Sequence, residues 1–319
     1  MVPIFQITGR AVWFVFSDLL TLFRLCWLPI GLLLATQYGL AYAVAHVSAG
    51  MQLEEMMETD AFAAVEFVDL LLQGLALSVI AVAVHRIILF GDRRPDQYFA
   101  FPFGKTEFLY VLMGGLSIAA ILVLVGILGV GFAIVGTAAG ADVTRLTEST
   151  PLTIAAVIVA LIGYVALVWL ALRLMVWPPA VVANNRLSFG EAWRLSKGNA
   201  LALLALSIAS SIAFIAIGGV VLIAGQRAGA LDALDLGKAL QFDDSIGAKL
   251  ARLLEHRINP HVIAFEFAFK FFIATYTVAI ISYAYKTLKG FDIDAPIDGQ
   301  SDVDVGVELE PGAKPLGKL

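Results

Sequence analysis

Long apolar stretches constrain this chain more than any other feature of its sequence. The segment AAVIVALIGYVALVWLALRL (155–174) contains one charged residue, Arg173. An α-helix needs about 20 mostly apolar residues to cross the hydrocarbon core of a bilayer. Six stretches of this kind occur, at about 25–48, 67–90, 108–137, 152–177, 200–225 and 262–287.

The composition of the chain supports the same conclusion. Of the 319 residues, 60% are hydrophobic and only 15% are charged. A soluble domain of this size cannot bury that much apolar surface. We therefore predict an all-α integral membrane fold, with a domain of six transmembrane helices over residues 25–290.

Lysine and arginine residues indicate the orientation of the helices, because loops rich in them remain in the cytoplasm. The connections after the second and fourth stretches are basic, whereas the loop over 49–66 contains neither residue. The loop over 226–260 contains five, but long translocated loops follow this rule less strictly. We therefore predict that both termini lie in the cytoplasm.

Two parts of the chain resemble each other. AVHRIILF is followed by FGKTEFLYVL, and ALRLMVW is followed at nearly the same distance by FGEAWRLSKG. The pattern indicates three parallel helix hairpins, each led in by a short interfacial helix, although any span that ends in the cytoplasm tends to finish with a base. The segments 1–24, 189–198 and, on the outer side, 248–258 have the opposed polar and apolar faces of interfacial helices.

The connection before the fifth stretch contains the first candidate site. Ser188 and Glu191 have the S-x-x-E spacing of a capping box, which predicts a helix that starts at Phe189. Tryptophan favours the headgroup level of a membrane, and basic side chains beside it can meet phosphate. The candidate lipid-headgroup contacts are Arg186, Trp193, Arg194 and Lys197. The alternative is that these residues only mark the start of a membrane helix.

Polar side chains within the spans form the second candidate site. Glu266 and Lys270 are four residues apart on one face of the sixth span. Asp69 and Gln73 have the same spacing on the second span, with Asp69 at a similar depth. Charged residues inside membrane helices are costly and indicate a function by default. Lys270 could instead reach the outer surface, which would make Glu266 and Lys270 an interfacial anchor.

The sequence contains no pattern typical of an enzyme, a metal site or a cofactor site. Its four histidines lack metal-ligand spacing, and no nucleophile elbow, phosphate loop or paired-cysteine motif occurs. The methionines of the acidic loop over 49–66 lack the histidine or cysteine partners that a soft-metal site needs. The acidic tail over 291–319 is short of large apolar residues and is predicted to be disordered.

The connection between the fourth and fifth spans also resembles a known group of proteins. The stretch over about 170–204 contains an arginine at the span end, two prolines, a turn of small residues and the run WRLSKG. It is similar to the membrane domain of bacterial glycerophosphoryl diester phosphodiesterases and to the YciC-like inner-membrane proteins. The resemblance implies a six-helix protein of the bacterial cytoplasmic membrane. It does not imply phosphodiesterase activity, because that chemistry belongs to a separate soluble domain that this chain does not match.

These features favour a non-enzymatic polytopic membrane protein that organises lipids or partner proteins in the cell envelope. The expected partners are membrane lipids and either another membrane protein or a second copy of the chain, and nothing points to nucleic acid. The alternative is a transporter or channel for a small solute or lipid, with a polar path near the sixth span. A membrane-embedded enzyme is the third hypothesis.

Overall fold

The structure is a computed structural model that describes residues 2–47, 60–92, 103–138, 150–227 and 260–297, and all regular elements in these ranges are α-helices. Six of them are long and apolar enough to cross a membrane: α2 (Leu19–Val47), α4 (Asp60–Phe90), α5 (Lys105–Ala138), α7 (Thr150–Leu174), α10 (Ala200–Arg227) and α13 (Pro260–Lys289). The described residues also form three shorter helices: α1 (Ile4–Ser17), α8 (Trp177–Asn184) and α9 (Phe189–Ser196). The predicted all-α fold with six membrane-spanning helices is confirmed.

The last helix, α13, lies at the centre of the bundle. It packs against α4, α1 and α2, and its buried side chains share one apolar core with theirs. Ile7 of α1, Ile30 of α2, Ile80 of α4 and Ala279 of α13 are all almost fully buried in this core. Lipid tails are as apolar as these side chains, so the core stabilises the bundle mainly by close packing.

The three predicted hairpins are not packed equally. α2 packs along α4 and α5 packs along α7, whereas α10 has little contact with α13. α1 packs against both α13 and α10 and so contacts both helices of the third hairpin.

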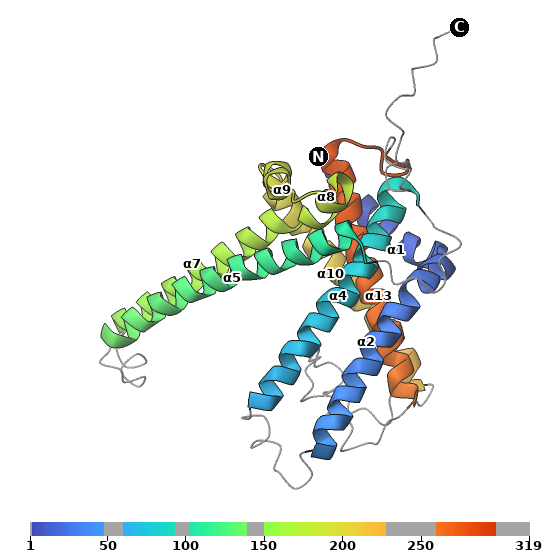
Figure 1. The fold of residues 1–319 in the computed structure, drawn as a ribbon. Coiled ribbons are helices and arrows are strands. Elements are labelled where there is room, and N and C mark those ends of the chain that lie inside the picture. The colour runs from blue at the N-terminus through green and yellow to red at the C-terminus, as the bar shows by residue number, and fades with distance from the viewer. Residues whose placement is uncertain (1, 48–59, 93–102, 139–149, 228–259, 298–319) are drawn as a thin grey trace, which may run out of the picture.

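Helices α5 and α7 form an arm that diverges from the rest of the bundle (Figure 1). They pack on each other, and a small residue brings them close: a Cβ added to Gly163 would lie 2.6 Å from Leu128 Cδ2. Many of the outward-facing side chains of the arm are apolar, as helices that face lipid require.

The N-terminal segment that was expected as one interfacial stretch is divided into two helices. α1 ends at Ser17 and α2 begins at Leu19, with Asp18 between them. One face of α1 is buried by the bundle and consists of Ile7, Ala11, Phe14 and Val15. The opposite face exposes Phe5, Trp13 and Phe16. α1 is therefore held by protein on one side and is apolar on the other.

The short helix α8 is buried. Pro178 and Pro179 lie in its first turn, where an absent N–H leaves no helical hydrogen bond unmade, and Asn185 ends the helix in the left-handed conformation (φ 49°). Its middle residues pack with Leu89 of α4 and Tyr285 of α13. α8 thus closes the end of the bundle at which α4, α5 and α13 meet.

Residues 291–297, which we call the strap, fold back across the same end of the bundle. The Phe291 N–H donates to Lys286 O and the Gly290 N–H donates to Thr287 O, with Gly290 at φ +77°. This Schellman arrangement reverses the chain, and it requires a positive φ that glycine adopts without strain. The Ile297 N–H then donates to Leu89 O at 2.6 Å.

The strap also brings the two ends of the described chain together. Arg10 of α1 and Asp294 form an ion pair with 2.6 Å between Nη2 and Oδ2. We call this side of the molecule, with α1, α8, α9 and the strap, the terminal end. The prediction of disorder from residue 291 is therefore wrong for residues 291–297. Residues 298–319, the predicted outer helix over 248–258 and the loop residues 49–59 lie outside the described residues.

Candidate functional site

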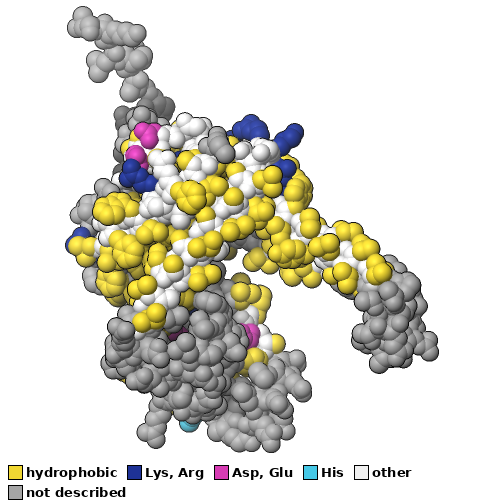
Figure 2. Space-filling model, turned by 180° about the vertical axis from the view of Figure 1, so that it is seen from behind, with side chains coloured by type: hydrophobic (Ala, Val, Ile, Leu, Met, Phe, Trp, Pro, Cys, Tyr) yellow, Lys and Arg dark blue, Asp and Glu magenta, His cyan; other side chains and the backbone are white. Residues whose placement is uncertain are grey.

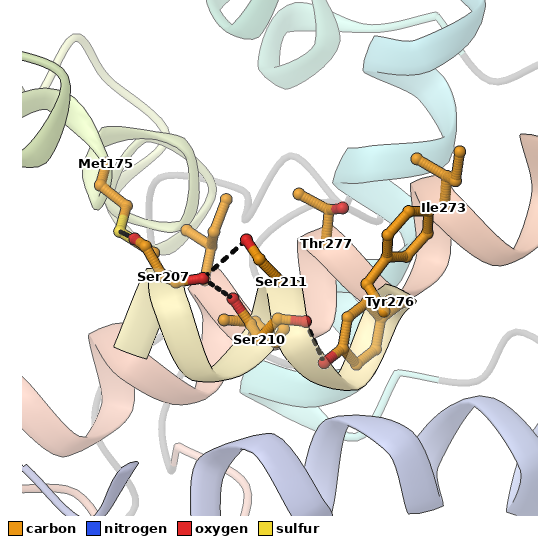
Figure 3. A pocket seen from close by; sticks show the side chains of 10 residues that line it. Met175, Ser207, Ser210, Ser211, Ile273, Tyr276 and Thr277 are labelled. Atoms are coloured by element: carbon orange, nitrogen blue, oxygen red, sulfur yellow. Dashed lines mark hydrogen bonds between the residues drawn. The ribbon is translucent and has the colours of Figure 1, made fainter. Parts of the chain in front are cut away.

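A groove of about 420 Å³ opens between α10 and α13, where these two helices make little contact. Figure 3 shows serines of α10 on one wall and Tyr276 and Thr277 of α13 on the other. The residues that line the groove are Met175, Ser207, Ser210, Ser211, Phe214, Ile273, Tyr276, Thr277, Ile280 and Ile281. Its volume lies within the range of about 300–1,000 Å³ that small-molecule sites occupy.

The three serines give one wall of the groove a polar character. Ser207, Ser210 and Ser211 have the i, i+3, i+4 spacing that places side chains on one helix face. Ser207 Oγ donates to Leu203 O at 3.0 Å, and the other two hydroxyls donate to Ser207 O at 2.9 and 2.8 Å. Across the groove, Tyr276 OH donates to Ser210 O at 3.1 Å. Each serine oxygen keeps lone pairs and can turn towards a ligand, so the groove combines an apolar volume with a row of hydroxyls.

A cation lies against two tryptophan rings near the end of α7. Met175, which lines the groove, lies two residues after Arg173. The Arg173 guanidinium carbon is 5.1 Å from the centroid of the Trp169 ring and 5.3 Å from that of Trp193. Ser196 Oγ also donates to Arg173 O at 3.3 Å, which ties α9 to the end of α7. Cation–π contacts of this kind contribute about 0.5–2 kcal/mol each.

Of the predicted headgroup residues, Trp193 contacts this cation. Trp193 is 41% exposed, and Arg186, Arg194 and Lys197 are exposed. Across the described part of the chain, these three basic side chains form no hydrogen bond or ion pair of their own. Lys and Arg side chains gather at the end of the molecule that carries α9 (Figure 2). We call Arg173, Trp193, Arg194 and Lys197 the basic rim; Arg186 lies beside it in the turn between α8 and α9.

The predicted capping box at the start of α9 is wrong. The helix begins at Phe189 as expected, but Ser188 makes no capping hydrogen bond through its side chain. Its Oγ donates instead to Arg186 O at 3.0 Å. Glu191, the other half of the expected motif, is engaged by other helices and does not bond the Ser188 N–H in this structure.

Glu191 is the centre of a polar network between α8, α9 and α13. Its Oε1 accepts from Lys289 Nζ at 2.6 Å and from Tyr285 OH at 3.0 Å, and its Oε2 accepts from Asn184 Nδ2 at 2.7 Å. Hydrogen bonds that involve charged groups are stronger than a neutral bond at a helix start, which explains why this network displaces the capping box. Burial raises the pKa of Glu191, but the bonds from Lys289, Tyr285 and Asn184 and the charge of Lys289 leave that pKa below its ordinary value.

Of the four intramembrane candidate residues, Asp69 and Gln73 form a hydrogen bond with each other. Asp69 is 1% exposed, and its Oδ2 accepts from Gln73 Nε2 at 2.8 Å and from Gln37 Nε2 of α2 at 3.3 Å. Among the described residues these amides are its hydrogen-bond partners, so the contact of Asp69 with Lys270 that its depth suggested does not form. Glu266 and Lys270 lie half-buried near the start of α13.

Two polar groups that sequence reasoning missed are buried at helix contacts. Gln37 could have been noticed as an amide inside an apolar stretch, like Gln73. His85 Nδ1 lies 2.6 Å from Ser282 Oγ, and both side chains are fully buried between α4 and α13. Ser282 Oγ is also within hydrogen-bond distance of Val278 O, at 2.8 Å, and the histidine tautomer decides which of the two groups donates in the His85–Ser282 bond. This pair fastens α4 to α13.

The fold and its groove define the class of the chain as a polytopic all-α membrane protein. Where side chains are described, no three of the His, Cys, Asp and Glu residues form a group that could hold a metal ion. No protein-family model, curated protein or solved structure matches the chain. The resemblance of residues 170–204 to the YciC-like group stays a prediction.

Proposed function

We propose that this chain is a non-enzymatic protein of the bacterial cytoplasmic membrane that organises lipid by holding an anionic phospholipid in the groove between α10 and α13. One observation carries the proposal: a groove lined by apolar side chains and hydroxyls opens between α10 and α13, and α9, which leads into α10, carries basic side chains that have no protein partner among the described residues. This combination fits a molecule with a negative head, a polar middle and an apolar body.

The depth of each part of the groove fits such a lipid. Ser207 lies seven residues into α10, which is about 10 Å along the helix axis. The headgroup zone of a bilayer is about 5–8 Å thick on each side. With its phosphate at the basic rim, a phospholipid would place its ester groups beside the serines and its acyl chains against Phe214 and Ile273. A serine hydroxyl can rotate from its helix carbonyl to donate to an ester oxygen.

The positive charge of the basic rim favours one class of lipid and one leaflet of the membrane. Arg173, Arg194 and Lys197 give the rim a positive charge, and basic residues near a membrane surface attract anionic lipid by about 1 kcal/mol each. The same charges favour a cytoplasmic position for the terminal end. The expected ligand is therefore an anionic glycerophospholipid of the cytoplasmic leaflet.

Neutralising the rim is expected to reduce lipid retention. In the double variant Arg194→Gln/Lys197→Gln, the loss of two charges at about 1 kcal/mol each lowers affinity for anionic phospholipid by roughly thirtyfold. Native mass spectrometry of the purified full chain, with phosphatidylglycerol and phosphatidylcholine added in equal amounts, measures this preference. The matched control is Lys105→Gln, an exposed base at the start of α5.

The groove itself has a separate test in the same experiment. Ser211→Phe places a ring in the groove and should reduce retention of both lipids, because it removes space for the chains. Equal binding of the two lipids by the unaltered chain, or full retention by both the rim and the groove variants, would contradict the proposal.

Transport of a small solute is the second candidate function, and the buried Asp69, Gln37 and Gln73 cluster favours it, since polar groups inside a bundle mark solute pathways in transporters. It predicts that liposomes containing the protein take up solute and that Asp69→Leu abolishes uptake. Liposomes that remain tight while lipid binding persists would exclude this alternative.

A further inference from the structure

Aromatic rings close one end of the groove between α10 and α13. Phe214 lies farthest along α10 of the described residues that line the groove, and its ring contacts three rings of α13. The distance between ring centroids is 6.5 Å to Tyr276, 6.2 Å to Phe272 and 6.1 Å to Phe269. We call these four residues the aromatic stop. It joins the two helices across the end of the groove.

The aromatic stop is held by interactions of its own. The rings of Phe214, Phe272 and Tyr276 are nearly parallel, with interplanar angles of 8°, 18° and 21° for the three pairs. Offset-stacked rings at such distances attract each other beyond the effect of their burial. Tyr276 OH also donates to Ser210 O at 3.1 Å, which links α13 to α10 at the same level (Figure 3). The stop is therefore a firm wall.

The other end of the groove lies towards the terminal end of the molecule. Ser207 and Met175 line the groove there, with 3.7 Å between Ser207 Oγ and Met175 Sδ. Ser207 and Phe214 are seven residues apart on α10, or about 10 Å along its axis. The groove is therefore short, and it runs from a row of hydroxyls to a wall of rings.

The volume of the groove limits how much of a lipid it can hold. A methylene group takes up about as much space as a water molecule, roughly 30 Å³. The 420 Å³ of the groove therefore accommodates about 14 such groups. That is enough for one acyl chain of medium length and too little for both chains of a glycerophospholipid. The second chain has an apolar surface outside the groove, because Ile208, Ile212 and Ile215 of α10 are exposed.

We propose that the groove holds one acyl chain of its phospholipid and that the aromatic stop limits the length of this chain. The inference rests on the proposed function, since it assigns the chain specificity of the same site. A chain that ends before Phe214 fills the groove without strain. A longer chain must push the rings apart or leave the groove early, and extra methylene groups forced into a filled site are unfavourable.

The test compares two phosphatidylglycerols that differ only in chain length. The purified full chain is mixed with equal amounts of the dilauroyl and the distearoyl lipid in detergent, and native mass spectrometry measures the ratio of the two complexes. The unaltered chain should retain the dilauroyl lipid roughly fivefold better. Phe214→Ala removes a ring from the stop and should bring this ratio close to one.

The matched control is Phe265→Ala. It removes a ring that stacks on Phe269, but Phe265 is not among the described residues that line the groove. This variant should keep the ratio of the unaltered chain. Any preference of the detergent for one lipid is the same for all variants, so the comparison between variants reports the groove.

A second variant acts in the opposite direction and keeps the test decisive if Phe214→Ala does not fold. Ile273→Phe adds a ring at the closed end of the groove and should raise the ratio at least twofold. Equal retention of the two lipids by the unaltered chain would overturn the inference and leave the proposed function standing. The same holds if neither Phe214→Ala nor Ile273→Phe changes the ratio, or if Phe265→Ala changes it as much as Phe214→Ala. Retention of neither lipid by the unaltered chain would overturn both.

Discussion

Replacement of Glu191 by alanine is expected to lower the free energy of unfolding by about 2–4 kcal/mol, because Lys289, Tyr285 and Asn184 each lose their shared partner. The Lys289 ammonium would remain partly buried without a counter-charge, since 27% of that side chain is exposed. Equilibrium unfolding in mixed micelles measures the loss.

The control for this prediction is a glutamate with a local role. Glu107 accepts the Gly104 N–H at 2.9 Å at the start of α5, and Glu107→Ala should cost only about 1 kcal/mol, as for other helix caps. A double-mutant cycle of Glu191→Ala with Lys289→Met should give a coupling energy above about 0.5 kcal/mol. Strict additivity of the two changes would show that the ion pair contributes nothing.

The contribution of Glu191 should also depend on pH. Its folded pKa lies below the ordinary value of 4.5, so the ionised form stabilises the fold. This stabilisation is complete above that ordinary value and is lost as the pH falls through the lower folded pKa. The difference in unfolding midpoint between the unaltered chain and Glu191→Ala should therefore shrink in acid. A difference that grows below pH 4.5 would contradict the network.

Replacement of Lys286 by methionine is expected to release the strap. Lys286 is 1% exposed, and its ammonium donates to Ile293 O at 3.0 Å and to Ala295 O at 2.5 Å. Hydrogen bonds to a charged donor contribute about 1.5–3 kcal/mol each, and methionine keeps the volume of the side chain but makes neither bond. We expect a loss of about 3–6 kcal/mol, the sum of the two bonds, and faster hydrogen exchange in residues 291–297.

The control for Lys286→Met is a substitution in the surface ion pair between Arg10 and Asp294. Arg10 and Asp294 are 43% and 47% exposed, so Arg10→Gln should cost less than about 1 kcal/mol and leave most of the exchange protection in place. If Lys286→Met kept the protection of the strap while Arg10→Gln removed it, the surface pair and not the buried lysine would hold this segment.

The six spans could be predicted from the sequence because a membrane helix satisfies its own backbone and needs only a sufficient apolar length. The packing of α10 could not, since α10 packs more extensively on α1, which lies far away in the sequence, than on α13. The capping box failed for a similar reason: Ser188 and Glu191 have the right spacing, but three partners from other helices bind the glutamate.

Those parts of the candidate site that consist of individual side chains could be predicted from the sequence. Trp193, Arg194 and Lys197 could be named because tryptophan and basic residues favour the membrane surface. The groove depends on two helices, although the spacing of Ser207, Ser210 and Ser211 was a signal that one face of α10 is polar. The partner of Asp69 on α2 could not be found from the sequence, because the register between two helices is a property of their packing.

The position of α1 has a consequence for how the protein is made. Its buried face packs against α13, which leaves the ribosome roughly 240 residues later, or about 10–50 seconds at typical rates of synthesis. During that interval Ile7, Ala11, Phe14 and Val15 lack the helix that covers them in the finished molecule. α1 therefore reaches its final position only after α13 has been synthesised, and this part of the bundle closes at that point.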